Sequence, residues 1–394
     1  RRRQNRLFKS PIASRVGSRH DFAHNSAGWG TDILQTRFVI MSVMYTSFKS
    51  GAALSRRSIR IWRVAQTGVW LIGAGIFVSL LAAPKVGLLV FWNILIPVAP
   101  ALIVVAVGLW RNVCPMATTT LLPRHLGLSN RKKMSGNTAA ILGFVAVMML
   151  FIIVPLRHTV FNVSGPATAM LLAVATGTGL TMGFFYEWKS AWCSSLCPIH
   201  PVERLYGGNV VMSLPNAHCG FCMKCVSPCP DSTANFSPGI GSDRRIQRIG
   251  SFILVGGLPG FIWGWFQTPD QPLLHGAAGI FEMYRFPIAG MSATLIVYAL
   301  LRKYVAPSGY RLIDASFAAA AVSCYYWFRI PALIGFGVNG KDGLLYDLHS
   351  FLPSCVPLSA SVLVTLFFFW WIVIRKPNGN SWTLRPAYGK METR

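Results

Sequence analysis

The sequence has 394 residues, of which 53% are hydrophobic and 12% are charged, with 37 Lys and Arg against 12 Asp and Glu. Soluble domains contain about 25% charged residues, so this composition excludes an ordinary soluble protein and indicates a polytopic membrane protein. The net charge of +25 would also suit a nucleic-acid binding protein, but the positions of the basic residues favour a different explanation.

The chain divides into five predicted regions. They are a basic arm at 1–63, a four-helix membrane region at 64–187, a cysteine-rich loop at 188–249, a second four-helix membrane region at 250–374, and a tail at 375–394. The apolar segments within them lie at 64–83, 87–109, 138–156, 166–187, 250–268, 285–302, 312–335 and 354–374. Each has about the 20 residues that cross a bilayer core. Backbone groups in lipid must bond within their own segment, so the predicted fold class is an all-α polytopic membrane protein with about eight transmembrane helices.

The basic residues alternate with these segments. If the N-terminus lies inside, the inner segments hold 32 of the 37 Lys and Arg, while Lys85, Arg157, Arg285 and Lys341 occupy the outer loops and Arg329 falls in the seventh span. This distribution follows the positive-inside rule. Contact with anionic lipid therefore explains the basic charge, and no nucleic-acid partner is expected. The predicted location is the cytoplasmic membrane, crossed several times, with both termini cytoplasmic.

The cysteine-rich loop contains the run Cys219-Gly-Phe-Cys222-Met-Lys-Cys225-Val-Ser-Pro-Cys229-Pro230. Bacterial ferredoxins use this C-x2-C-x2-C-x3-C-P spacing to hold cubane iron–sulfur clusters, and the cysteine before Pro usually ligates a second cluster. A zinc site normally needs two separated C-x-x-C pairs, and a disulfide knot does not suit the reducing inner side. The spacing therefore predicts a ferredoxin-like iron–sulfur loop on the cytoplasmic face.

Two shorter fragments precede this motif, and each follows a pair of predicted spans. The run Trp192-Cys193-Ser-Ser-Leu-Cys197-Pro198 has the C-x3-C-P spacing, whereas Trp110-Arg-Asn-Val-Cys114-Pro115 has Trp where the earlier cysteine would sit. The two fragments form a loose internal echo, in which each helical hairpin delivers a Cys-Pro loop to the same side of the membrane.

The number of clusters depends on how the cysteines are shared. In a two-cluster arrangement, the first set of ligands is Cys219, Cys222, Cys225 and Cys197, and the second contains Cys229, Cys193 and Cys114. The second set then needs another ligand, which Asp231, His200, His218 or a partner subunit could supply, unless that cluster has three irons. The alternative is one cluster, held by the first three cysteines and either Cys197 or Cys229.

The Trp-Cys-x-x-x-Cys-Pro loop followed by a full ferredoxin motif resembles the polyferredoxin-like membrane iron–sulfur proteins. That family includes membrane subunits of periplasmic nitrate reductase systems, nitrous-oxide reductase maturation flavoproteins and accessory proteins of cytochrome oxidase assembly. The resemblance covers residues 86–235 and matches Cys193, Cys197 and the four cysteines of the ferredoxin motif position by position. Trp110 and the presence of a single ferredoxin motif depart from the family pattern.

The resemblance implies a membrane-bound electron-transfer subunit with one or two 4Fe-4S clusters. It would relay electrons between the quinone pool and a cytoplasmic partner or other subunits of an oxidoreductase complex. A soluble ferredoxin-type carrier could dock on the basic loop at 123–133. The alternative is a non-redox scaffold or assembly subunit of a larger complex, in which the cluster has only a structural role and cross-links the loop at 188–249.

Other residues carry weaker signals. The outer histidines His158, His275 and His349 could ligate haem or copper or line a quinol site, although a hydrogen-bonded histidine is the more common case. Glu187, Asp314 and Arg329 lie near the ends of spans, where ionisable groups are either functional or able to reach water. For Cys324 and Cys355, the expected role is that of small buried residues.

Overall fold

The computed structural model describes residues 50–51, 55–132, 134–186, 191–211, 214–218, 244–270, 276–340, 342–376 and 383–386. All of them belong to one compact unit, Ser47–Arg394. The predicted ligands Cys219, Cys222, Cys225, Cys229 and Asp231 lie outside the described residues.

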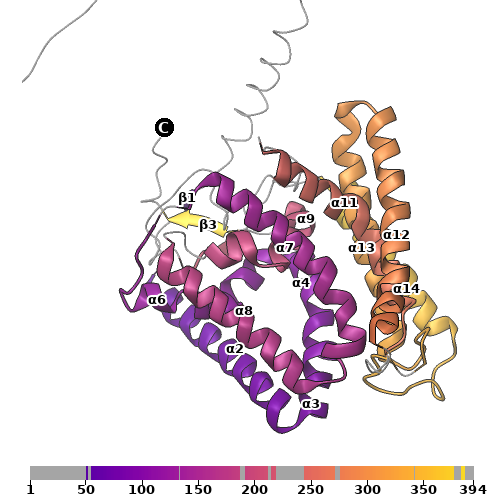
Figure 1. The fold of residues 1–394 in the computed structure, drawn as a ribbon, viewed down its shortest axis with the longest axis horizontal. Helices are drawn as coiled ribbons and strands as arrows, with labels where there is room; N and C mark the ends of the chain where they lie inside the picture. The colour runs from indigo at the N-terminus through magenta and orange to yellow at the C-terminus, as the bar shows by residue number, and fades with distance from the viewer. Residues whose placement is uncertain are drawn as a thin grey trace, which may run out of the picture. The chain divides into compact units, whose positions relative to one another are not determined.

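The described part of the chain is built almost entirely from helices (Figure 1). The first group consists of α2 (Arg56–Ala82), α3 (Pro84–Leu88), α4 (Ile96–Val113), α5 (Pro115–Thr120), α6 (Leu122–His125), α7 (Gly136–Leu156), α8 (Gly165–Phe185) and α9 (Ile199–Tyr206). The second consists of α11 (Arg245–Phe266), α12 (Gly276–Tyr304), α13 (Tyr310–Leu333) and α14 (Cys355–Phe369). Segments of π-helix (η1 Leu89–Leu95, η2 Arg157–Phe161, η3 Trp192–Leu196, η6 Trp370–Ile374) and 3₁₀-helix (η4 Gly207–Asn209, η5 Pro307–Gly309) adjoin them.

Seven helical segments of the described chain are long and apolar enough to cross a membrane. They are Arg56–Ala82, Pro84–Thr120, Gly136–Phe161, Gly165–Phe185, Arg245–Phe266, Gly279–Tyr304 and Cys355–Ile374. They confirm a helical, multi-pass membrane protein in contact with lipid. The eighth predicted span, 312–335, forms helix α13 but is not one of the seven. Its buried residues include Asp314 and Arg329, so α13 faces protein along part of its length and needs less apolar surface.

Serine side chains begin three of the long helices. Ser55 accepts a hydrogen bond from the backbone N–H of Ser58 at the start of α2, and Ser135 does the same for Thr138 in α7. Ser164 caps α8. Such caps satisfy N–H groups that have no partner within the helix. The cap at Ser55 explains why α2 begins at Arg56 rather than at the predicted residue 64.

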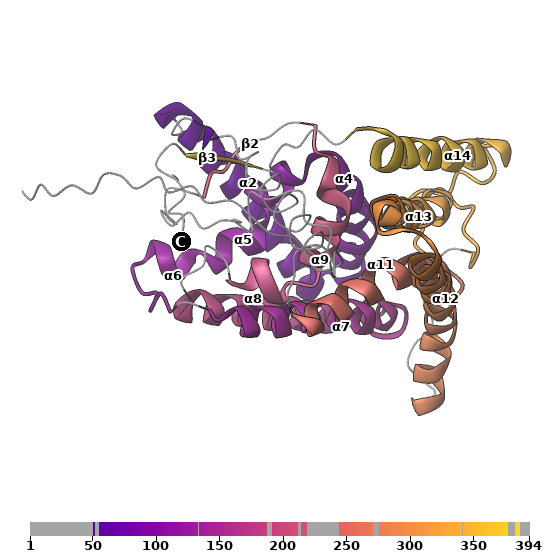
Figure 2. The same cartoon turned by 90° about the horizontal axis from the view of Figure 1, so that it is seen from above.

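Helix α11 lies at the centre of the bundle. Buried residues make up 67% of its most apolar stretch, against 17–28% in the other six candidate spans. Its side chains Leu254 and Leu258 belong to the same core cluster as Val104 of α4, Val147 of α7 and Val322 of α13. Figure 2 shows α11 between α7 and the remaining helices of the second group. The two predicted membrane regions therefore share one core.

Glycines bring α11 and α12 into close contact. A Cβ atom at Gly260 would overlap the carbonyl oxygen of Gly290, and one at Gly264 would overlap that of Phe286. Further along, Gly256 packs against Tyr298, so the two helices run antiparallel. Small residues allow such close approach of helix backbones in membranes, where van der Waals packing drives association.

The segments predicted to be inner meet at one end of the bundle, which we name the cysteine face: the described residues of 110–137 and 191–218 together with the start of α11. Asn112 donates a hydrogen bond to the carbonyl of Pro215 at 3.0 Å, and Arg244 donates one to Asn137 at 3.0 Å. A small parallel sheet joins this face, because β1 (Ser50–Gly51) and β2 (Leu214–Pro215) both pair with β3 (Thr383–Pro386).

The segments predicted to be outer meet at the other end, which we name the distal face: the described residues of 83–93, 157–164, 266–270 and 334–354. Asn93 donates a hydrogen bond to the carbonyl of Leu344 at 3.0 Å. The backbone N–H of Asp270 donates to a carboxylate oxygen of Asp342 at 2.7 Å, and Asn162 donates to Asp270. The helices therefore separate two polar faces, as the charge pattern predicts.

The glycine contact between α11 and α12 can be tested by substitution. Gly260→Val should lower the free energy of unfolding by about 1–3 kcal/mol or more, because the added atoms force the helices apart. The matched control is Gly75→Ala, since Gly75 is exposed in α2 and a Cβ there would meet nothing within 4 Å. Thermal unfolding in detergent, followed by tryptophan fluorescence, measures both. Equal stability of the two variants would contradict the packing.

Candidate functional site

The two Cys-Pro fragments adopt matching backbone conformations on the cysteine face. Cys114 has φ −54° and ψ 122°, and Cys197 has φ −63° and ψ 121°. Each ends a helical segment, and each donates its N–H to a tryptophan carbonyl at 2.9 Å, Trp110 for Cys114 and Trp192 for Cys197. A following proline disfavours helical geometry and pushes the preceding residue toward an extended conformation. The predicted echo between the two fragments is therefore present in the backbone.

The three described cysteines of this face lie near one another. Burial raises the pKa of the Cys197 thiol well above its ordinary value, and negative charge at Cys193, Glu203 and Cys114 raises it further. Cys193 and Cys197 pack against a buried cluster that includes Trp192. Within the described residues, no three His, Cys, Asp or Glu side chains are close enough to hold a metal ion. The described thiols alone therefore do not make a complete ligand set.

A buried carboxylate, Glu203 of α9, connects the two fragments. It accepts hydrogen bonds from Arg111 and, at 2.9 Å, from the indole N–H of Trp110. Its side chain lies 3.3 Å from Nδ1 of His200, which is also 3.3 Å from Arg111. Arg111 and Glu203 are 7% and 6% exposed, so this is a buried ion pair. Trp110, which stands where the family pattern has a cysteine, binds Glu203 here.

The surroundings keep Glu203 ionised and His200 neutral. Burial alone would raise the pKa of Glu203, but the charge of Arg111 and hydrogen bonds from His200 and Trp110 outweigh it and lower that pKa. Burial lowers the pKa of His200. A buried charge that loses its partner is strongly destabilising. The pair therefore fixes α9, and with it Cys197, against the end of α4.

A second set of hydrogen bonds holds the segment that leads into Cys219. The side chain of Asn112 accepts a hydrogen bond from the N–H of Ala217 at 3.0 Å and donates one to the carbonyl of Pro215 at 3.0 Å. Gln66 of α2 donates to the carbonyl of Asn112 at 3.0 Å and lies 3.4 Å from Nε2 of His218. The fragment around Cys114 therefore positions the chain immediately before the ferredoxin motif.

Five of the predicted site residues lie in the part of the chain that the structure describes. They are Cys114, Cys193, Cys197, His200 and His218. The three cysteines lie on the same face of the bundle, and Cys114 and Cys193 both influence the charge of Cys197. His200 uses Nδ1 in the contact with Glu203, so Nε2 would have to serve as a ligand. His218 is 1% exposed and its Nε2 faces Gln66, so ligation would fall to Nδ1.

Sequence reasoning missed the residues that hold these candidates in place. They are Gln66, Arg111, Asn112 and Glu203. A signal was present for two of them, because Arg111 and Glu203 are opposite charges that each lie within a few residues of a Cys-Pro pair. Nothing in a local pattern identifies Asn112 or Gln66, whose partners are distant in the sequence.

The two described histidines predicted to be outer, His158 and His349, belong to no group of three metal-ligating side chains among the described residues. His158 bonds Asp270 and the carbonyl of Trp265 through its two ring nitrogens, so neither is available to haem or copper. His349 is exposed and its ring lies 4.8 Å from that of Phe336. His275 lies outside the described residues, as does Glu187.

The structure also describes three other residues that the sequence singled out, which are Asp314, Cys324 and Cys355. Asp314 accepts a hydrogen bond from Tyr298 at 2.7 Å and pairs with Arg302 at 3.5 Å, which favours a structural role over a proton relay. Cys324 is half-buried in α13, close to expectation. Cys355 differs from expectation, because it is exposed as the first residue of α14.

Comparison with protein-family models, with curated proteins and with solved structures finds no match to this chain. The similarity to polyferredoxin-like proteins therefore depends on the cysteine motifs themselves.

The buried ion pair yields a stability prediction. Glu203→Gln should lower the free energy of unfolding by about 3–5 kcal/mol at neutral pH, because Arg111 stays buried without a counter-charge. The folded pKa lies below the ordinary value of 4.5. The ionised group therefore stabilises the fold above that pH, and the stabilisation is lost as the pH falls through the folded pKa. Thermal unfolding from pH 7 to pH 3.5 should show the difference from the wild type narrowing.

The control for this prediction is Glu282→Gln, because Glu282 forms an exposed ion pair with Arg285 at 3.3 Å. Exposed pairs contribute about 0–1 kcal/mol. A Glu203→Gln variant as stable as this control at pH 7 would contradict the importance of the pair.

Proposed function

We propose that this protein is a membrane-bound electron-transfer subunit that carries one or two 4Fe-4S clusters on its cysteine face. The observation that supports it best is the pairing of the two Cys-Pro fragments. Their matching backbones place Cys114 and Cys197 near Cys193, and the same fragment that contains Cys114 holds the chain leading into the ferredoxin motif. Three segments that carry or precede cysteines therefore lie together on this face, which is the arrangement a shared cluster would need.

The donor set fits such a cofactor. Thiolates are the usual ligands of iron–sulfur clusters, and the thiols of Cys114 and Cys193 lie close enough to Cys197 to influence its charge. The described segment at 214–218 leads directly into the four cysteines of the ferredoxin motif. A cubane cluster, when bound, supplies a site that accepts and releases one electron at a time. Arg111 and Glu203 would hold Cys114 and Cys197 in position, and both thiols are half-buried.

The proposed electron partners are a quinone in the bilayer and a protein on the cysteine face. The ends of the candidate spans near this face expose apolar side chains, such as Leu109 and Phe184. The basic loop at 123–133 offers the exposed residues Arg131 and Lys132 to an acidic ferredoxin-type carrier or to another subunit of a redox complex, whereas Arg124 is buried. The positive-inside distribution supports a cytoplasmic position for this face and for both termini.

The proposal predicts iron in the purified protein. The full chain, isolated without oxygen, should contain about four iron atoms for one cubane cluster or about eight for two, and should give a cubane EPR signal after reduction with dithionite. Cys222→Ser should lower the iron content by one cluster. Cys355→Ser, at an exposed site at the start of α14, should leave it unchanged. Iron below one atom per chain and no EPR signal would remove the proposal.

The scaffold alternative makes a different prediction for the same variants. In the electron-transfer account, wild-type protein reduced with dithionite transfers its electrons to an added quinone, and Cys222→Ser loses this reaction while remaining folded. If a folded Cys222→Ser variant supports normal electron flow in its complex, the cluster has only a structural role.

Asn112 is not a proposed ligand, but it should affect how firmly the cluster is held, because it positions the segment at 214–218. Asn112→Ala removes two hydrogen bonds to the segment at 214–218, and loss of such supporting contacts weakens metal binding about 10–100-fold. Iron release to a chelator, measured by absorbance, should therefore be faster. The matched control is Asn137→Ala on the same face, which removes an exposed hydrogen bond from Arg244. Equal release from the two variants would contradict the positioning role of Asn112.

A further inference from the structure

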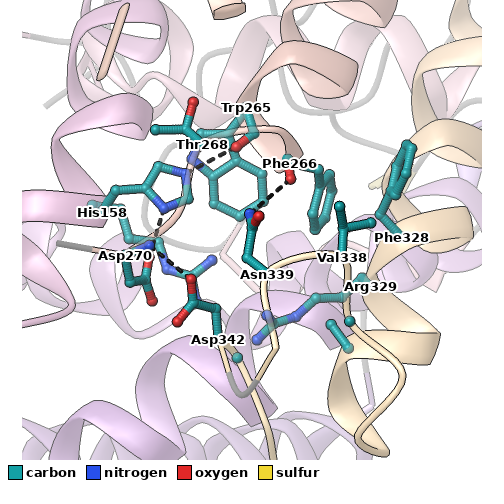
Figure 3. A pocket seen from close by; sticks show the side chains of 14 residues that line it. His158, Trp265, Phe266, Thr268, Asp270, Phe328, Arg329, Val338, Asn339 and Asp342 are labelled. Atoms are coloured by element: carbon teal, nitrogen blue, oxygen red, sulfur yellow. Dashed lines mark hydrogen bonds and ion pairs between the residues drawn. The ribbon is translucent and has the colours of Figure 1, made fainter. Parts of the chain in front are cut away.

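A group of buried cationic side chains lies on the distal face, away from the cysteines. Arg157, His158 and Arg329 line one cavity between η2, the end of α11, α13 and the residues at 337–339 and 342–343. Figure 3 labels His158 and Arg329 at this cavity. The cavity has a volume of about 30 Å³, which is room for one or two particles the size of water.

Arg157 is the least satisfied of these groups. Its side chain is 4% exposed and its guanidinium lies between two tryptophan rings, 5.1 Å from the centroid of Trp92 and 5.0 Å from that of Trp265. Ring faces attract the positive charge but do not replace hydrogen-bond acceptors for its five N–H groups. Its Nε is buried and has no hydrogen-bond acceptor among the described residues. Such a group requires an acceptor from elsewhere.

The bonding of His158 adds a second positive charge. Nδ1 lies 2.6 Å from a carboxylate oxygen of Asp270, and Nε2 lies 3.1 Å from the carbonyl oxygen of Trp265. Both partners are acceptors, whereas a neutral imidazole has only one N–H. Both bonds form only when the ring carries two protons, so the geometry favours the imidazolium. Burial opposes the charge on Asp270, but the bond from His158 and the charge of Arg157 outweigh it and lower the pKa of Asp270.

Arg329 supplies the third cation. It is 2% exposed, and its Nη2 donates to the carbonyl of Trp92 and the side chain of Asn93, both at 2.8 Å. Its Nε has no acceptor among the described residues. Gly343 has a positive φ of 76°, and a Cβ atom there would overlap Arg329, so the loop closes directly over the guanidinium.

The carboxylates at this site do not balance these cations. Asp270 and Asp342 are the two acidic residues that line the cavity. Burial and the charge of Asp270 raise the pKa of Asp342, against the hydrogen bond from the backbone N–H of Asp270. Three cations therefore face at most two negative charges. A wider vestibule of about 430 Å³ shares Asp270, Asp342 and Gly343 with the cavity and adds another cation, Lys85.

We propose that this cavity binds one small monovalent inorganic anion of the chloride class between Arg157 and Arg329. The anion would accept a hydrogen bond from Arg157 and would add a negative charge that balances the cations. A water molecule would accept the hydrogen bond but would add no charge. Larger oxyanions and ring compounds exceed the volume. The vestibule offers the route of entry, and its Lys85 attracts ions of this sign. The proposal is independent of the iron–sulfur cofactor.

The test uses the full chain in detergent at constant ionic strength, with sodium chloride replacing sodium gluconate, whose anion is too large for the cavity. Bound chloride should broaden the ³⁵Cl NMR line in a saturable manner, and bromide should compete. Above saturation, each tenfold rise in chloride should raise Tm by about 2 °C. Arg157→Gln should abolish both effects. Arg285→Gln, at an exposed site that pairs with Glu282, should retain them.

The wild-type NMR measurement decides the proposal even if Arg157→Gln fails to fold. Absence of saturable broadening would overturn it and leave water as the occupant of the cavity. Equal broadening in a folded Arg157→Gln variant would also overturn it, because the anion would then bind elsewhere. Lys85→Gln, which changes only an exposed residue at the mouth, should weaken chloride binding severalfold while the protein stays folded.

Discussion

The arrangement of the cysteine face depends on one buried carboxylate. Glu203 is held away from water, and the partners that keep it ionised come from the end of α4 and from its own helix. Because leaving a buried charge unpaired is so unfavourable, α9 cannot move away from α4 without a large loss of stability. Cys114 follows α4 and Cys197 precedes α9, so the same interaction sets the separation of these two thiols. The position of the proposed cluster thus follows from electrostatics as much as from the cysteine spacing.

Buried cations are neutralised differently at the two ends of the bundle. On the cysteine face, the guanidinium of Arg111 bonds directly to the carboxylate of Glu203. On the distal face, aromatic rings flank Arg157 without bonding its N–H groups, and the cations outnumber the carboxylates. Helix α7 alone spans 21 residues between the two faces, about 31 Å of helix. A ligand on the distal face therefore lies far from the thiols.

Hydropathy and charge predicted the helical membrane architecture well, because both are local properties of the sequence. The predicted spans agree with the helices to within several residues. The largest differences occur where a helix begins before its predicted apolar span, as at Arg56 and Gly276. Helix α13 shows the limit of this reasoning. Its polar residues are buried among other helices, and hydropathy cannot separate a helix shielded by protein from one that faces lipid.

The motifs indicated which cysteines matter, but not what supports them. The pairs Arg111–Glu203, Asn112–Pro215 and His158–Asp270 join residues about 90 to 112 positions apart. Such contacts arise from tertiary packing and leave no periodic signal. Arg329 stood out because an arginine within a predicted span is unusual. Arg157 did not, since by its position it was only an outer-loop charge, and the sandwich between two tryptophans is visible only in three dimensions.

Iron-edge anomalous scattering from crystals grown without oxygen tests the central claim most directly. The account predicts anomalous density on the cysteine face, next to Cys197 and within reach of the chain that follows His218. Density for cystine bridges in place of iron on this face, or iron bound only at another part of the molecule, would contradict it.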